Sequence, residues 1–366
     1  MQEQQGEQGL DEPLLELNNV SIEFGRDSSW LSRLGFSADL FGESSVVRAV
    51  DGVSLDMYEN DVVVLVGESG CGKTTLGKAA IGIHRPLVGE IKYRGQDIWD
   101  AFDKRGDVNI PFKEIRKSLQ IIHQDPGSSL NPNKRVISSL AKPLLKWQTD
   151  MPREARETRI YELLERVGMS PPEDYAQRYP HQLSGGEKQR VALVRALLMN
   201  PDIILADEAV SALDVSLRIE MMDLLLELQD VYNTSYLFIS HDLSNARYIA
   251  EKAGGRIGVM YLGRLVEIGP VDQIINDPKH PYTQVLRWAT PHLEEKGTSD
   301  PPLRKIDIPD PVDPPAGCRF HTRCPEAREM CANQYPPTYD VSPKHEVSCY
   351  RVDSEHEYWE SPELED

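Results

Sequence analysis

The sequence predicts an α/β fold built on a parallel sheet, and two observations support that prediction. A mostly β-branched run, Val62–Leu65, ends in a glycine-rich turn and continues into a helical pattern at Thr75–Gly82. A buried strand, a tight turn and a helix in that order begin an α/β unit. Two further apolar runs that are typical of buried strands follow much later, at Ile203–Ala206 and Tyr236–Ile239. We therefore expect parallel strands that are covered by helices.

The other elements are expected around this core, in chain order. Alternating apolar residues at 14–24 and 46–57 predict an antiparallel pair of strands. The insert between them, 25–45, is expected to form a surface hairpin on its own domain or to contact a partner or membrane surface, because it contains Trp30, Leu31, Leu34, Phe36, Leu40 and Phe41. Amphipathic helices are expected at Arg156–Val167, Glu187–Met199 and Leu217–Leu228, and an extended linker at Pro301–Pro315.

The composition bounds the class of protein. The chain has 366 residues and a formal net charge of −19, which argues against broad binding to nucleic acid backbones. Residues 1–12 and 353–366 are acidic and are expected to be disordered. No apolar run approaches the roughly 20 residues that cross a bilayer. The N-terminal residues lack the pattern of a secretory signal, so we expect a protein of the cytoplasm.

Residues 67–75 have the spacing of a phosphate-binding loop, and they lie between the first predicted strand and its helix. Glycines let backbone N–H groups surround phosphates, and the helix N-terminus adds partial positive charge. Lys73 is placed to reach the β- and γ-phosphates, Thr74 to coordinate Mg²⁺, and Cys71 to fill space. The candidate nucleotide ligands are Gly67, Glu68, Ser69, Gly70, Cys71, Gly72, Lys73, Thr74 and Thr75.

Two adjacent acids, Asp207 and Glu208, follow the predicted strand Ile203–Ala206. Side chains alternate along a strand, so the two carboxylates are expected to do different work. Asp207 suits Mg²⁺ coordination, and Glu208 suits the polarisation of a water molecule for attack on the γ-phosphate.

Residues 183–190, Leu-Ser-Gly-Gly-Glu-Lys-Gln-Arg, open the predicted helix Glu187–Met199 and resemble the signature motif of ABC-type ATPases. Other motifs of that family follow the expected order over residues 14–270. Gln124 resembles the Q-loop glutamine, Asp214 belongs to a D-loop-like segment, and His241 resembles the switch histidine. Phe24 is a plausible adenine-stacking residue.

The resemblance implies a P-loop NTPase with a RecA-like core at 13–268, an antiparallel β subdomain and a helical signature subdomain at about 126–199. It implies ATP and Mg²⁺ as ligands, with Gln124 near the metal. It also implies a head-to-tail dimer, in which Ser184, Gly185 and Gly186 of each subunit cap the ATP of the other. One departure is that Ala209-Val210 stands where the family usually has Pro-Thr, which puts the stiffness of that turn in doubt.

The segment 269–352 resembles the C-terminal extension of the oligopeptide/dipeptide branch of this family. The resemblance rests on residues 124–132, on residues 278–283 and on four cysteines, Cys318, Cys324, Cys331 and Cys349. Their wide spacing lacks the close cysteine pairs of zinc ribbons. The resemblance implies a 4Fe-4S cluster in some members, with structural zinc and unligated thiols as the alternatives. His321 and His345 are alternative ligands.

The resemblance thus implies an ATPase subunit that powers the import of peptides or similar small solutes. Its partners would be a second ATPase subunit, identical or related, two transmembrane permease subunits and an extracytoplasmic solute-binding protein. It would lie peripherally on the cytoplasmic face of the membrane. Two alternatives are a soluble ABC ATPase of the translation or repair type and an iron–sulphur protein with a vestigial ATPase. Soluble factors usually carry tandem ATPase halves or a coiled-coil insert, and the sequence shows neither.

Overall fold

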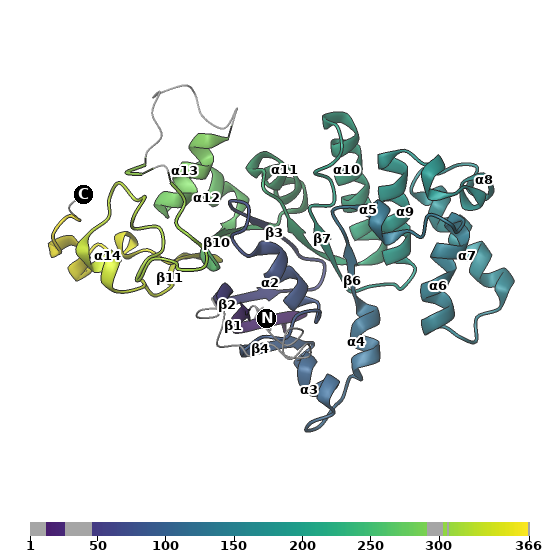
Figure 1. The fold of residues 1–366 in the computed structure, drawn as a ribbon, viewed down its shortest axis with the longest axis horizontal. Helices are drawn as coiled ribbons and strands as arrows, with labels where there is room; N and C mark the ends of the chain where they lie inside the picture. The colour runs from purple at the N-terminus through teal and green to yellow at the C-terminus, as the bar shows by residue number, and fades with distance from the viewer. Residues whose placement is uncertain (1–11, 26–45, 291–302, 306, 365–366) are drawn as a thin grey trace, which may run out of the picture.

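The computed structural model describes residues 12–25, 46–290, 303–305 and 307–364. Its centre is an eight-stranded sheet (Figure 1) with the order β11-β12-β10-β9-β3-β8-β7-β6. The pairs β9-β3, β3-β8, β8-β7 and β7-β6 are parallel, so the predicted parallel sheet is confirmed. These strands are β3 (Val62–Val66), β6 (Leu119–Ile122), β7 (Ile203–Asp207), β8 (Ser235–Ile239) and β9 (Arg256–Tyr261).

A second, antiparallel sheet has the order β2-β1-β4-β5. Strands β1 and β2 pair with Leu15 opposite Met57, so the predicted antiparallel pair is also confirmed. The apolar face of this sheet and that of helix α2 share one core with β3. The expected hairpin at 25–45 lies outside the described residues, apart from Gly25. The elements of this region are β1 (Leu15–Phe24), β2 (Val47–Met57), α2 (Lys73–Ala80), β4 (Val88–Tyr93) and β5 (Gln96–Asp97).

A group of helices, the helical part, lies beyond β6 at one end of the molecule (Figure 1). It contains α5 (Pro126–Ser129), α6 (Val136–Trp147), α7 (Arg153–Arg166), α8 (Pro172–Gln177) and α9 (Gly185–Leu197). Short helices α3 (Ile98–Asp103) and α4 (Phe112–Ser118) precede β6, and α10 (Val215–Tyr232) and α11 (Leu243–Ala253) flank β8. The predicted amphipathic helices correspond to α7, α9 and α10, each of which begins two or three residues before its predicted start.

The described residues from 271 to 364, called the C-terminal part below, extend the central sheet. Strand β12 (His345–Val347) pairs antiparallel with β10 (Arg264–Pro270), and β11 (Tyr339–Ser342) pairs with β12. Buried Phe320, Cys324 and Ala327 join the core that underlies β7 and β8. The remaining elements are α12 (Val271–Asn276), α13 (Pro281–Ala289), α14 (Glu329–Asn333), η3 (Tyr350–Val352) and η4 (Glu357–Glu360).

The expectation of a disordered C-terminal tail is wrong for residues 353–364. Tyr358 is buried, and its hydroxyl donates to the Glu326 carbonyl at 2.6 Å. The Trp359 indole N–H donates to the Asp353 carbonyl at 3.0 Å. These aromatic side chains therefore anchor the acidic segment. The apolar area that they bury and the hydrogen bonds of their polar ends stabilise it against the mutual repulsion of its acidic side chains. The expected N-terminal tail falls almost wholly on residues 1–11, which are outside the described part.

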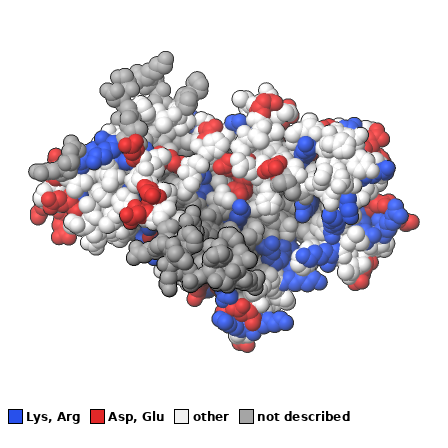
Figure 2. Space-filling model, viewed as in Figure 1, with Lys and Arg blue, Asp and Glu red and all other residues white. Residues whose placement is uncertain are grey.

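The net negative charge is unevenly distributed. On the face shown in Figure 2, Lys and Arg side chains gather over the helical part and the neighbouring α3–α4 region. Among the described helices, none combines the length and the apolar character that a membrane span needs.

Candidate nucleotide site

The phosphate-binding loop requires glycine at two places where other backbone segments approach it. Gly67 has a φ of 148°, and a Cβ there would lie 2.1 Å from the Met260 carbonyl oxygen. Gly72 has a φ of 104°, and its Cβ would lie 2.2 Å from the Ala49 carbonyl oxygen. The loop thus fits between β9 and the start of β2, directly before α2. A left-handed glycine at the helix start leaves the N-terminal N–H groups of α2 available to an anion.

Lys73 is buried at the base of the loop. Its ammonium donates to the carbonyl oxygens of Gly67 at 2.8 Å and Glu68 at 3.0 Å. Cys71 is also buried, and burial raises the pKa of its thiol. A buried neutral thiol is a poor nucleophile, which agrees with a space-filling role.

Thr74 in the first turn of α2 contacts Asp207 at the end of β7, although β8 lies between β7 and β3, the strand that leads into the loop and α2. The Thr74 hydroxyl donates to Asp207 Oδ1 at 2.8 Å, and Lys78 Nζ lies 3.8 Å from Asp207 Oδ2. The hydroxyl and the carboxylate present oxygen atoms, the ligand type that Mg²⁺ prefers. Magnesium would also be bound by the phosphates of a nucleotide in the loop.

Three predicted catalytic residues lie together at the end of β7. Glu208 Oε2 accepts a hydrogen bond from Gln124 Nε2 at 2.9 Å and lies 3.4 Å from His241 Nδ1. Gln124 follows β6, and His241 follows β8, so three neighbouring parallel strands supply the group. The carboxyl ends of parallel strands share one edge of a sheet, which explains why residues so distant in sequence converge.

The turn after Glu208 is fixed by buried contacts. Ala209 and Val210, which depart from the family pattern, are both buried in the core. The side-chain amide of Gln189 on α9 donates to the Ala209 carbonyl. The Ser211 hydroxyl donates to the Glu208 carbonyl at 2.9 Å. Packing and hydrogen bonds therefore hold this turn without proline.

The signature residues form the start of α9. The Ser184 hydroxyl accepts from the Glu187 N–H at 3.2 Å, and the Glu187 carboxylate accepts from the Ser184 N–H at 2.6 Å. This reciprocal pair is a capping box. Ser184 and Gly185 are exposed and Gly186 is half-buried. Figure 1 shows α9 within the helical part and well apart from α2, so one subunit does not bring its signature to its own phosphate loop.

Two further predicted residues lie at the periphery. Asp214 is exposed, and its carboxylate caps α10 by accepting from the Leu217 N–H at 3.0 Å. Phe24 is 42% exposed at the end of β1, where its ring makes an edge contact with His84.

Two contacts to the loop were not predicted from the sequence. The Tyr282 hydroxyl accepts from the Glu68 N–H at 2.9 Å, and Arg323 Nη1 lies 3.0 Å from both carboxylate oxygens of Glu68. Both residues belong to the C-terminal part. Tyr282 lies in residues 278–283, which support the family resemblance but carry no predicted role, and Arg323 carries no local signal.

Comparison with known proteins decides the family. The family described as ABC transporter matches residues 50–211, and the oligopeptide/dipeptide transporter C-terminal region matches 266–331. The oligopeptide transport ATP-binding protein AppF of Bacillus subtilis is 42% identical over 83% of this chain and 89% of its own. The dipeptide transport ATP-binding protein DppF of Escherichia coli is 40% identical over 86% of this chain and 90% of its own length.

This chain belongs to the ATP-binding proteins of ABC transporters. It is therefore an ABC-type ATPase with the expected α/β fold of P-loop NTPases. Among solved structures, the ABC transporter cassette MJ0796, in a dimeric post-hydrolysis state with ADP and Pi, is 26% identical with a TM-score of 0.56, over 70% of this chain and 98% of that one. CbiO1 of Clostridium perfringens shares the fold, with 21% identity and a TM-score of 0.57 over 73% of this chain and 92% of that one.

In this ABC ATPase the four C-terminal cysteines line one small cavity, together with His321, Phe320 and Tyr358. None of the thiols is in a disulfide. Burial raises the pKa of all four, to about 12 for Cys324 and about 11 for Cys349. Among the described residues no three His, Cys, Asp or Glu side chains are grouped closely enough to hold a metal ion. His345 instead lies 2.8 Å from Glu267.

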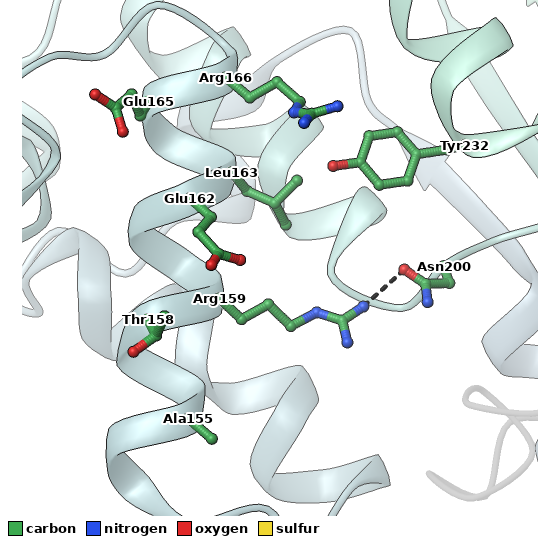
Figure 3. Close-up of a pocket in the computed structure, with 9 residues that line it drawn as sticks. All are labelled: Ala155, Thr158, Arg159, Glu162, Leu163, Glu165, Arg166, Asn200 and Tyr232. Carbon is green, nitrogen blue, oxygen red and sulfur yellow. Dashed lines mark hydrogen bonds between the residues drawn. The ribbon is translucent and has the colours of Figure 1, made fainter.

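A separate surface hollow of about 870 Å³ lies beside α7 of this ABC ATPase (Figure 3). Arg159 Nη2 donates to Asn200 Oδ1 at 2.7 Å across it, and the Arg166 guanidinium lies 5.7 Å from the Tyr232 ring centroid. None of its lining residues belongs to the predicted nucleotide site.

Proposed function

We propose that this ABC ATPase powers the import of dipeptides, oligopeptides or similar small solutes. The observation that carries the proposal is the set of peptide-transport relatives, which match across more than four-fifths of the chain. The match to the oligopeptide/dipeptide C-terminal region supports the same substrate class. The intact grouping of Gln124, Glu208 and His241 supports hydrolysis rather than nucleotide binding alone.

Each polar group of the site has a proposed role. The loop and Lys73 bind the phosphates of ATP, and Thr74, Asp207 and Gln124 supply oxygen ligands for Mg²⁺. Bound magnesium offsets charge on the β- and γ-phosphates. Glu208 accepts a proton from the attacking water, and Gln124 orients that water. His241 donates a hydrogen bond to the γ-phosphate as its charge develops.

The capping residues are proposed to act across a dimer interface. Ser184, Gly185 and Gly186 lie exposed or half-buried at a helix N-terminus, which suits an anion. Asp214, the N-cap residue of α10, is proposed to belong to the same interface. The ATPase partner is a copy of this chain or a related subunit. Closure of the dimer would move two permease subunits, which receive solute from an extracytoplasmic binding protein. The ATPase would then lie peripherally on the cytoplasmic face of the membrane.

The four cysteines are proposed to hold a 4Fe-4S cluster, with zinc as the alternative. Support comes from four thiols that line one cavity, of which Cys324 is buried and the other three are half-buried, because four cysteine thiolates are the usual ligands of such a cluster. A bound centre would supply cross-links within a segment that has little secondary structure.

Replacing Glu208 with Gln tests the enzymatic proposal. We expect Mg²⁺-dependent phosphate release to fall by about 100-fold or more while ATP binding is retained, because the amide cannot accept the proton. The control is Glu162→Gln, an exposed acid on α7 away from the site. A Glu208→Gln rate equal to wild type would contradict the assigned role.

Reconstitution separates transport from a soluble role. With cognate permease subunits in liposomes, we expect turnover to rise when a peptide-loaded binding protein is added. Turnover that is indifferent to the membrane subunits would favour a soluble ATPase of the translation or repair type.

Metal analysis of the anaerobically purified chain tests the cysteine proposal. We expect about four iron atoms per chain and broad visible absorbance, both lost in Cys331→Ser. Cys71→Ser is the control, because Cys71 lies in the phosphate loop. Zinc without iron would favour the alternative, and neither metal would contradict both.

A further inference from the structure

We propose that the C-terminal part completes the nucleotide site, with Arg323 as a positioning residue that neutralises Glu68 in the phosphate loop. This inference rests on the proposed binding of ATP and extends it. A carboxylate inside a loop that surrounds a triphosphate repels the ligand unless a cation offsets it. Arg323 is the cation in contact with that carboxylate.

Three polar groups of Glu68 are held by named partners. The carboxylate faces Arg323 Nη1 at 3.0 Å for each oxygen, the N–H donates to the Tyr282 hydroxyl at 2.9 Å, and the carbonyl accepts from Lys73 at 3.0 Å. Two of these partners come from the C-terminal part. The loop conformation at Glu68 therefore depends on residues more than 200 positions away.

Arg323 is itself held rigidly. Its side chain is only 5% exposed, compared with 24% for Glu68. Its N–H donates to the Phe320 carbonyl at 2.9 Å, and its guanidinium lies 3.4 Å from the Tyr261 hydroxyl. The Phe320 ring contacts the rings of Tyr261 and Tyr282. Preorganised and little exposed, the guanidinium offsets charge more strongly than a surface arginine would.

The same turn has a second anchor. Arg319 is buried and its guanidinium bonds to the Asp51 carboxylate of β2 and to the Leu262 carbonyl. Asp51 also lies 2.6 Å from Arg264. Residues 319–323 are thus fixed to both sheets, which gives Arg323 a defined position relative to the loop.

Loss of Arg323 alone leaves the Glu68 carboxylate without a counter-charge beside the nucleotide. For Arg323→Met we expect the ATP dissociation constant to rise by at least about tenfold, with a smaller rise for ADP because it carries less charge. The increase should shrink as ionic strength rises. A purely structural defect would weaken both nucleotides alike.

A double-mutant cycle provides the decisive test. Nucleotide affinity is measured by equilibrium fluorescence for the wild-type full chain, Arg323→Met, Glu68→Gln and the double variant. We expect the double variant to bind ATP within about threefold of Glu68→Gln, because Arg323→Met removes no charge compensation once the carboxylate is absent. Arg323→Lys, which keeps the charge but not the shape of the guanidinium, should bind ATP more tightly than Arg323→Met. If Arg323→Met does not fold, Arg323→Gln takes its place.

Arg328→Met is the matched control. This arginine lies in the same extension and donates to the carbonyls of Trp359 and Ser361, without contact to the loop. Thermal melting and metal content are measured for each variant, because Arg323 lies beside Cys324.

The outcomes are distinguishable. A wild-type chain that does not bind ATP would refute the proposed function and this inference with it. A wild-type chain that binds ATP while Arg323→Met binds equally well would overturn the inference alone. A double variant as weak as Arg323→Met would also overturn it, because charge compensation would then not explain the loss.

Discussion

Glu208 lies in the left-handed region, with a φ of 49°, at the point where the chain leaves β7. A residue with a Cβ pays about 1 kcal/mol or more for that conformation. The structure offsets the cost by bonding the Glu208 N–H to the Ile239 carbonyl at 3.2 Å and its side chain to Gln124. The carboxylate lies beside Gln124 and His241, and the proposed role of Glu208 in hydrolysis rests on this arrangement.

The loop glycines provide a prediction at the same scale. Gly72→Ala should lower the free energy of unfolding by at least about 3 kcal/mol, because its Cβ would collide with the Ala49 carbonyl in addition to adopting a positive φ. Gly70→Ala is the matched control. Gly70 has a φ of 81° but no atom within 4 Å of its Cβ, so about 1 kcal/mol is expected. Urea denaturation measures both, and equal losses would contradict the steric argument.

At the scale of elements, strands β3, β7 and β8 of the central sheet were predicted from the sequence, whereas the other five strands of that sheet were not. Strands β3, β7 and β8 are continuous apolar runs, which is the pattern of strands buried on both faces. Strand β12 has three residues, two of them polar, so no apolar pattern predicts it; it pairs with β10, and His345 lies 2.8 Å from the buried Glu267 of that strand. Most site residues could be predicted because each belongs to a motif of neighbouring residues in the sequence. The Arg323–Glu68 contact could not, because its partners are 255 positions apart.

Helix α13 carries a pH-sensitive cap. The His280 side chain accepts from the Tyr282 N–H at 3.0 Å, and complete burial lowers its pKa from 6.5 to about 4. The folded state thus holds this imidazole neutral, while the unfolded state protonates it below about 6.5. Stability should be unaffected above pH 6.5 and should fall by up to about 3 kcal/mol as the pH drops from 6.5 toward 4.

His280→Asn tests this contribution, because asparagine can cap the helix without titrating. Chemical denaturation at intervals between pH 7.5 and pH 4 should give a shallower decline for the variant than for the wild type. Parallel curves would show that another group causes the loss.

At the scale of the whole molecule, α9 lies apart from α2, so in the proposed head-to-tail dimer one subunit would supply one half of each of two sites. We expect Glu208→Gln to dimerise when Mg-ATP is added, because bound ATP bridges the loop of one subunit and the signature of the other. Size-exclusion chromatography with light scattering would measure the molar mass with and without Mg-ATP. The double variant Glu208→Gln with Ser184→Arg, which places bulk and charge at the start of α9, should stay monomeric. A Glu208→Gln chain that stays monomeric at saturating ATP would indicate that its partner is a different subunit.

Strand β12 makes the C-terminal part a continuation of the sheet rather than an appendage. The two family matches, 50–211 and 266–331, suggest a natural place to exchange parts between relatives, yet the second begins inside β10. A chimera joined there would leave one protein's Glu68 opposite another protein's turn at 319–323. If Arg323 acts as proposed, such an exchange would preserve nucleotide binding only when the new turn also supplies an arginine opposite Glu68.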